Sequence, residues 1–177
     1  MANYNDLVYR YMLGEVGEGR LNMSGTGWGQ YKDTQYPDSG SPFTLALNTD
    51  TVIPNNAGAK IEDYLPIGVD EFYNGASNLL SGRKGDSIDI MAYFKAVPTV
   101  NNQWLDVWLD IIGLGEFYRQ TFSFPRGAGT ERGVVYSLSS LYNLDTWVAN
   151  GAKLYMRSNA SLDIYGISYN IDRSHQG

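Results

Sequence analysis

Short runs of alternating apolar and polar residues, separated by turn-forming residues, most limit how this chain can fold. From Trp28 onward the runs begin about every 8 to 12 residues, and Gly, Pro, Asn and Asp lie between them. An alternation of period two places the apolar side chains on one face of a strand, and that face must be buried. The pattern predicts roughly eight to ten antiparallel strands in one all-β domain.

The stretch WLDVWLDII, residues 104–112, is the clearest of these runs. In a strand, one face would consist of Leu105, Val107, Leu109 and Ile111. The opposite face would consist of Trp104, Asp106, Trp108 and Asp110. A helix would also align several of these residues, but the run is short and two glycines follow it, which favours a strand. Two indole rings between carboxylates are too apolar for an ordinary surface and too charged for a dry core, so we expect a partner to cover this face.

Three local signals predict how the later strands connect. Asn150-Gly151 lies between two alternating runs, which is typical of a two-residue type I′ hairpin. The alternation of the final run, residues 161–172, changes at Gly166, and this change indicates a β-bulge. The glycine-rich segment RGAGTERG, residues 126–133, is expected to form a hairpin loop.

Two packed antiparallel sheets would bury one face of every strand, and the number of strands fits a jelly-roll sandwich. An immunoglobulin-type sandwich is the alternative, although the long segments at 29–41 and 66–86 fit it poorly. Residues 1–25 differ from the rest and are expected to form an N-terminal arm, with the jelly-roll domain at 26–177. The arm carries apolar side chains that another molecule could cover, namely Leu7, Val8, Tyr9, Tyr11, Met12 and Leu13.

Composition narrows the classes of partner. The 177 residues have a formal net charge of −6, and their Lys and Arg residues are scattered, which argues against nucleic acid. No run of 18 apolar residues is present, so we expect no membrane partner. The chain has no cysteine but contains 14 Tyr, 6 Phe and 4 Trp. This excludes thiolate chemistry and favours aromatic contacts with a ligand or another chain.

Candidate catalytic and metal-binding residues do not combine into a site. The single histidine, His175, lies near the C-terminus, where a Ser-His-Asp triad is not expected. In a strand, Asp106 and Asp110 would be ~13 Å apart, which exceeds the separation of glycosidase carboxylates. The carboxylates most suited to calcium, Asp86, Asp89 and Asp145, lack the spacing of a calcium-binding loop. We therefore expect no enzymatic activity, no cofactor and no metal.

Two binding hypotheses fit the aromatic residues. In the first, Trp104 and Trp108 form a platform for sugar rings, and the chain is a monomeric carbohydrate-binding module. In the second, aromatic strand faces pack against identical copies around a symmetry axis. The apolar arm favours assembly, because it could hold a protein partner and has no evident use in binding a sugar.

Several segments in order along the chain resemble a group of small bacteriophage virion proteins with a tumour-necrosis-factor-like jelly roll. The resemblance covers about residues 27–173 and rests on GWGQYKDTQYPDSGSPFTLAL, VIPNNAGAKIEDYLP, GRKGDSIDIMAYFKAV, FSFPRGAGTERG and NGAKLYMRSNASLDIYGISYNIDR. It implies a homotrimer with aromatic residues near the threefold axis. The candidates for the axis are Trp104, Trp108, Tyr155, Tyr165 and Tyr169, each of which could equally fill the core of a single chain.

The resemblance also implies a location and a partner. A homotrimeric capsid decoration protein would bind the major capsid protein and stabilise the head, after assembly in the cytoplasm of the bacterial host. The alternatives are a receptor-binding or tail-fibre head domain, for which a glycan is a possible ligand, and the monomeric carbohydrate-binding module.

Overall fold

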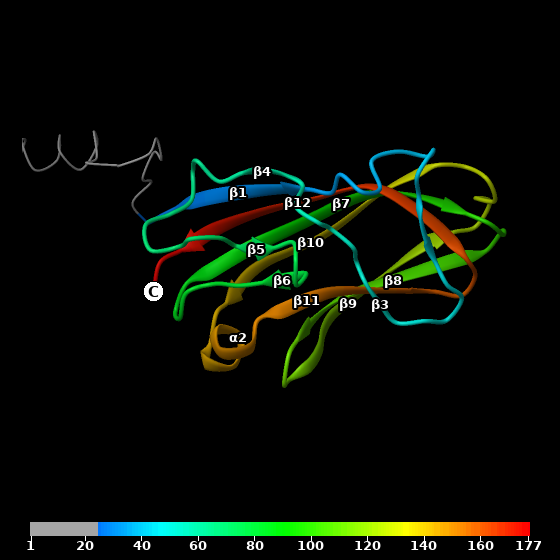
Figure 1. Cartoon of the computed structure of the whole chain (residues 1–177). Helices are drawn as coiled ribbons and strands as arrows, with labels where there is room; N and C mark the ends of the chain where they lie inside the picture. The colour runs from blue at the N-terminus through cyan, green and yellow to red at the C-terminus, as the bar shows by residue number, and fades with distance from the viewer. Residues whose placement is uncertain (1–24) are drawn as a thin grey trace, which may run out of the picture.

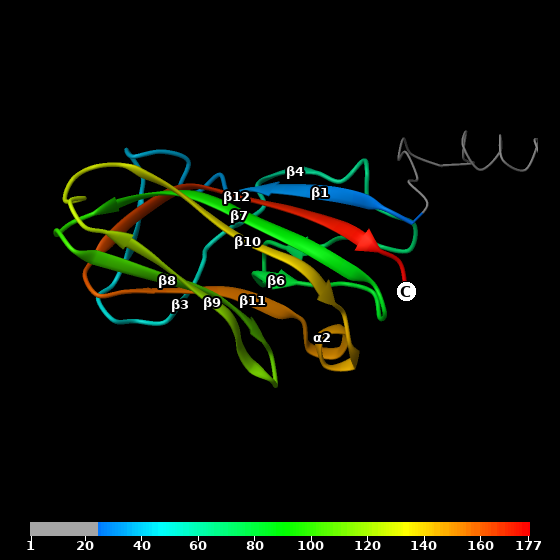
Figure 2. The same cartoon turned by 180° about the vertical axis from the view of Figure 1, so that it is seen from behind.

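Two antiparallel sheets of six strands each form a sandwich (Figure 1). The structure is a computed structural model, and it describes residues 25–177. Sheet I has the strand order β10-β7-β12-β1-β4, and β2 also pairs with β12. Sheet II has the order β5-β6-β11-β8-β9, and β3 also pairs with β11. Figure 2 shows the same two layers from behind. The prediction of a two-sheet antiparallel jelly-roll sandwich is confirmed.

The strands differ widely in length. Sheet I consists of β1 (Gly27–Lys32), β2 (Phe43–Leu45), β4 (Ala59–Ile61), β7 (Ser87–Pro98), β10 (Arg132–Tyr142) and β12 (Leu162–His175). Sheet II consists of β3 (Thr51–Val52), β5 (Tyr73–Asn74), β6 (Leu79–Leu80), β8 (Gln103–Ile111), β9 (Gly115–Phe124) and β11 (Ala152–Ser158). The described residues thus hold twelve strands, more than expected, because several are only two or three residues long.

The core lies between the sheets and follows the alternation in the sequence. On β8, the predicted inward residues are buried: Leu105, Val107, Leu109 and Ile111. On β7 of the opposite sheet, the buried set is Ile88, Ile90, Ala92 and Phe94. These apolar side chains meet between the two sheets in one continuous cluster. Residues 104–111 are therefore a strand, as the short run and its following glycines indicated.

Strands β7 and β12 form the centre of sheet I. They pair from Leu162 opposite Pro98 to His175 opposite Ser87. The register shifts between Tyr165 and Ser168, where Gly166 has a positive φ of 63°. A glycine adopts this backbone conformation without steric cost. The predicted bulge is confirmed, and its position reverses which residues of β12 point inward.

The predicted hairpin at Asn150-Gly151 is wrong. Residues Asp145–Asn150 form the helix α2, and Gly151 ends it with a φ of 75° and an N–H group that donates to the carbonyl of Trp147 at 2.6 Å. An Asn-Gly pair suits a helix C-terminus as well as a hairpin. The helix places the indole of Trp147 in the core with 2% of its surface exposed. No helix among residues 25–177 is long and apolar enough to cross a membrane.

The segment RGAGTERG, residues 126–133, is also not a hairpin loop. It follows β9, which pairs with β8 in sheet II, and leads into β10, which pairs with β7 in sheet I. The segment therefore crosses from one sheet to the other at one end of the sandwich, which Figure 1 shows on the right. Alternating apolar and polar residues on both sides of a loop predict two strands. They do not show whether the two strands pair with each other.

A buried ion pair closes the opposite end of the sandwich. The guanidinium of Arg173 donates to the carboxylate of Asp86 at 2.8 Å, and neither side chain has more than 1% of its surface exposed. Arg173 also donates to the carbonyl of Gly25 at 2.9 Å, and the N–H of Gly177 donates to Asp86 at 3.2 Å. This ion pair therefore holds the start and the end of the described chain together.

We expect Arg173→Met to lower the free energy of unfolding by up to about 3 to 5 kcal/mol, because it leaves the buried Asp86 carboxylate with Arg83, at 3.2 Å, as its remaining counterion. Chemical denaturation followed by circular dichroism would measure the loss. Arg157→Met is the matched control, since Arg157 pairs with Asp50 at 3.5 Å on the surface, and such pairs contribute about 0 to 1 kcal/mol. Equal losses in the two variants would contradict the structural role of Arg173.

Candidate functional site

The outer face of sheet II is closed by an arginine from its own chain. Trp108 on β8 stacks on Tyr155 of β11, with the ring centroids 5.7 Å apart and an interplanar angle of 16°. The guanidinium of Arg119 on β9 lies 4.2 Å from the centroid of the Trp108 ring. As a result, only 4% of Trp108 is exposed. A guanidinium over an indole face is a favourable cation–π arrangement.

Carboxylates on both sides hold Arg119 in place. Its Nη1 donates to Asp106 at 2.7 Å, while its Nε and Nη2 donate to the two oxygens of Glu116 at 2.7 and 2.5 Å. Asp106 also accepts from the hydroxyl of Thr121 at 2.6 Å. The hydrogen bonds from Arg119 lower the pKa of Glu116. A two-point contact with Glu116 and a single hydrogen bond to Asp106 thus fix the guanidinium over the indole.

This arrangement identifies the cover that the WLDVWLDII pattern required. The cover is Arg119 of the same chain, and no second molecule is needed to shield Trp108. The proposed sugar platform of Trp104 and Trp108 is not available either, because the guanidinium occupies the exposed face of the second ring. The sequence could not reveal this, since Arg119 reaches Trp108 only after β8 and β9 pair.

The five aromatic residues expected near a symmetry axis are at least half-buried in the single chain. Trp104 and Tyr155 are half-buried on the outer face of sheet II. Tyr165 is 4% exposed, and its hydroxyl donates to Glu131, which also pairs with Lys95 at 2.9 Å. This hydrogen bond to a carboxylate raises the pKa of Tyr165.

Tyr169 requires a correction. It is 1% exposed and lies between the sheets, edge-on to Tyr73 with 4.9 Å between the ring centroids. Its hydroxyl donates to the carbonyl of Ile53 at 3.3 Å, and burial raises its pKa well above the usual value. Because the bulge at Gly166 turns residue 169 inward, this ring is part of the core and is withdrawn as an interface candidate.

The outer face of sheet I is open. Trp28 on β1, Met91 on β7 and Val135 on β10 are 38%, 42% and 46% exposed. Uncharged polar residues lie between them: Gln30, Ser137, Ser168 and Asn170. The amide of Gln30 donates to that of Asn170 at 2.9 Å. We call these seven residues, together with the half-buried Tyr93, the sheet I face.

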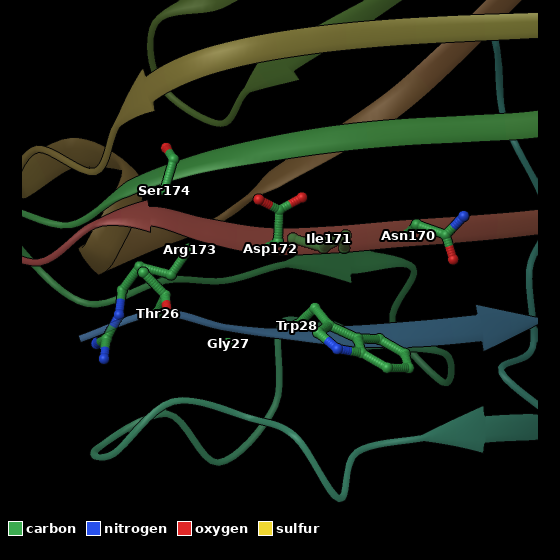
Figure 3. Close-up of a pocket in the computed structure, with 8 residues that line it drawn as sticks. All are labelled: Thr26, Gly27, Trp28, Asn170, Ile171, Asp172, Arg173 and Ser174. Carbon is green, nitrogen blue, oxygen red and sulfur yellow. The ribbon is translucent and has the colours of Figure 1, made fainter. Parts of the chain in front are cut away.

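A pocket of about 530 Å³ lies at one end of the sheet I face (Figure 3). Figure 3 shows the indole of Trp28 beside β1 and the side chains of Asn170 and Asp172 on the neighbouring β12. The Trp28 ring stacks on Tyr64 at 5.0 Å, which holds it in place. Partial burial and the nearby Asp89 raise the pKa of Asp172. The pocket therefore combines a fixed aromatic ring with a carboxylate that the fold disfavours in its charged form.

The two outer faces differ in charge. The outer face of sheet II carries acidic and basic residues throughout, namely Asp106, Asp110, Glu116, Arg119, Lys153 and Arg157. The charges of sheet I lie toward the ends, with Asp89 and Asp172 at one end and Lys32 and Lys95 at the other. Sequence reasoning missed this face because its exposed apolar residues, Trp28, Met91 and Val135, come from three strands that are distant in sequence.

The acidic residues and the histidine do not form a reactive centre in the described part of the chain. His175 is exposed at the end of β12. Asp86 pairs with Arg173, Asp89 accepts from the N–H of Ser140, and Asp145 pairs with Lys84 on the surface. Among residues 25–177, no three His, Asp or Glu side chains are grouped so that they could hold a metal ion.

The residues expected to contact a capsid lie outside the described residues. They are Leu7, Val8, Tyr9, Tyr11, Met12 and Leu13. Their role stays a prediction.

Comparison with known proteins identifies the fold. No protein-family model matches the chain, and no curated protein matches it. Among solved structures, Eiger TNF from S. frugiperda is similar, with a TM-score of 0.52, 5% identity, and coverage of 86% of this chain and 95% of that chain. This likeness shows a tumour-necrosis-factor-like jelly roll, so the immunoglobulin-type alternative is excluded.

Two viral proteins are similar at lower scores. The PRD1 vertex protein P5 has a TM-score of 0.47 and 12% identity, with coverage of 89% of this chain and 76% of that chain. A tobacco streak virus coat protein has a TM-score of 0.40 and 11% identity, with coverage of 86% of this chain and 87% of that chain.

Arg119→Ala should expose Trp108 to solvent, because it removes the guanidinium that lies 4.2 Å from the centroid of the ring. In protein labelled with 5-fluorotryptophan, we expect the Trp108 fluorine signal, assigned through Trp108→Phe, to gain a solvent-isotope shift in Arg119→Ala. Arg157→Ala, on the same face but not over the ring, should leave the signal unchanged. An unchanged Trp108 signal in Arg119→Ala would show that another group covers the indole.

Proposed function

We propose that this chain is a non-enzymatic structural protein of a bacteriophage virion, a homotrimer that decorates the capsid. The observation that carries the proposal is the sheet I face, an exposed strand surface whose centre is apolar or uncharged. The sequence resemblance to small phage virion proteins supplies the virion context, and the tumour-necrosis-factor-like jelly roll is compatible with it.

The composition of the sheet I face favours contact with another protein chain. Trp28, Tyr93 and Met91 are residue types that are enriched in interfaces, and charged residues are depleted at interface centres. The uncharged polar side chains between them can form hydrogen bonds across an interface without the desolvation cost of a charge. The outer face of sheet II is less suited, because its ion pairs are already satisfied within one chain.

A ring of three copies is one way in which contacts through this face would close. If the sheet I face packs against a different surface of the next copy, the contact is heterologous, and rotation by a third of a turn closes it. The resemblance implies the same number of copies. In such a trimer the aromatic surface near the axis comes from Trp28 and Tyr93, whereas Trp104 and Trp108 stay on the outside.

The proposed attachment to the capsid uses residues 1–25. Gly25 lies beside Arg173 and the C-terminal residues at one end of the sandwich. The described chain therefore begins at that end, opposite the loop at 126–133 (Figure 1). Apolar side chains at positions 7–13 would bind the major capsid protein, so this end of each subunit would face the shell.

Met91→Lys should dissociate the trimer without unfolding the chain, because a charge at an uncharged interface centre must lose its hydration without a counterion. We expect the dissociation constant to rise by more than about tenfold, which corresponds to at least about 1.4 kcal/mol, while the melting temperature of the monomer changes little. Sedimentation velocity across a concentration series would measure the effect. Lys153→Glu on sheet II is the control and should keep the mass of the trimer; wild-type protein that sediments as a monomer would refute the homotrimer.

Removal of residues 1–24 should abolish capsid binding and leave the trimer intact. The truncation keeps Gly25, whose carbonyl binds Arg173. Cosedimentation with empty heads of the same phage would measure binding. A full-length variant with Leu7, Tyr11 and Leu13 changed to Ser would show whether binding depends on the apolar side chains or only on the length of the arm. If the truncated trimer still saturates the heads, the arm is not the attachment segment.

A further inference from the structure

A second pocket lies at the end of the sandwich farthest from Gly25 and the C-terminus. Its volume is about 600 Å³, and the residues that line it include Phe122, Ser123, Pro125, Arg126 and Arg132. The pocket lies between β9, at the edge of sheet II, and β10, at the edge of sheet I. In Figures 1 and 2 the loop that joins these strands is drawn in yellow at the end away from the C-terminus.

Two arginines without a counterion line this pocket. The described residues contain six arginines, and four of them, at positions 83, 119, 157 and 173, take part in ion pairs. The other two are Arg126 and Arg132, both exposed, and neither has a carboxylate of residues 25–177 within 4 Å. In a chain of net charge −6, two uncompensated guanidinium groups at one pocket make a local positive site.

The neighbouring acidic residue does not neutralise them. Glu131 precedes Arg132 in the chain, but its carboxylate binds Lys95 at 2.9 Å and also accepts from the hydroxyl of Tyr165. These contacts lower the pKa of Glu131, so it stays ionised and committed to them. No acidic residue lines the pocket. Both guanidinium groups are therefore available to an anionic group, which each can bind through two parallel N–H donors.

The rest of the lining indicates what carries the anionic group. The pocket is much larger than a single carboxylate or phosphate and falls in the size range of small-ligand sites. Phe122 and Pro125 give it an apolar wall, and Ser123 offers a hydroxyl. Because β9 and β10 each pair with a neighbour on one side only, their free edges add backbone donors and acceptors. Sugar rings present apolar C–H faces and hydroxyls together, which matches this mixture.

We propose that this pocket binds an acidic saccharide, with Arg126 and Arg132 holding its carboxylate or phosphate group and Phe122 contacting the sugar ring. The accessibility of the pocket rests on the proposed function: if the end of the sandwich at Gly25 faces the capsid, the Arg126 and Arg132 end points away from it. Acidic polymers at a cell surface would then reach the pocket. The pocket and its charge do not depend on that orientation.

Isothermal titration of the full-length protein tests the site. The probes are a hyaluronan tetrasaccharide for the carboxylate, maltotetraose 1-phosphate for the phosphate, neutral chitotetraose, inorganic phosphate and a hexaglutamate peptide. We expect at least one acidic saccharide to bind at least tenfold more tightly than the last three probes. Its affinity should fall as salt rises from 25 to 500 mM, because the arginines are exposed.

A pair of matched variants assigns the binding to the pocket. The double variant Arg126→Gln with Arg132→Gln should bind the acidic saccharide at least tenfold more weakly. Lys32→Gln with Lys153→Gln removes the same charge at two other cations without an ion pair and should change the affinity less than twofold. Equal losses in both variants would mean that net charge alone attracts the ligand, which would overturn the site.

Other results would also overturn the proposal. If inorganic phosphate or hexaglutamate binds as tightly as the saccharides, the pocket is a general anion site or a peptide site and not a saccharide site. If neither acidic saccharide binds with a dissociation constant below 10 mM, the pocket does not bind this class of ligand. A change in sedimentation mass for Arg126→Gln with Arg132→Gln would place the arginines in a contact between copies. None of these results bears on capsid binding, so the saccharide site and the decoration function can fail separately.

Discussion

The pairing of β7 with β12 is the interaction on which the rest of the structure depends. It covers the whole of β7 and joins residues 87–98 to 162–175, the last strand of the chain. Strand β12 also pairs with β1 and β2, and β7 with β10, so the complete sheet I requires β12 to be in place. Such non-local pairing requires the chain to lose loop-closure entropy before the strands form their favourable contacts. The buried Arg173–Asp86 pair lies at the end of this ladder. Because its hydrogen bonds require one register, it fixes the position of β12 more specifically than apolar contacts alone would.

The bulge at Gly166 and the guanidinium of Arg119 together decide which surface is left for a partner. The bulge turns Tyr169 into the core, and Arg119 closes the outer face of Trp108. Both effects remove aromatic surface that would otherwise face water. Less aromatic surface is therefore left for identical copies to cover than the aromatic content of the sequence indicates. What remains exposed is the sheet I face, where Trp28, Met91 and Val135 come from three separate strands. The proposed self-association would therefore use this face and not the WLDVWLDII strand.

Much of the fold could be predicted from the sequence because the signals were local. The alternation of β7 and β8 gave the inward residues, and the change at Gly166 gave the bulge. The failures were questions of long-range pairing. Asn150-Gly151 fits both a hairpin and a helix end, and only the core position of Trp147 selects the helix. The segment 126–133 joins two strands whose partners lie in different sheets. Likewise, neither the cover of Trp108 nor the unpaired state of Arg126 and Arg132 could be inferred before the ion pairs of the folded chain were known.

The proposed roles occupy separate parts of the sandwich, and the topology explains why they do not interfere. Both ends of the described chain meet at the Arg173–Asp86 pair, so residues 1–24 connect to the sandwich at that end. The proposed assembly would use the outer side of sheet I, whose central strands β7 and β12 are the most extensively paired in the fold. Ligand binding would use the opposite end, where β9 and β10 separate into different sheets and their free edges leave room for a pocket. A substitution in the 126–133 loop can alter that pocket without changing the β7–β12 ladder, so the proposed saccharide binding can vary independently of the proposed trimer and its proposed attachment.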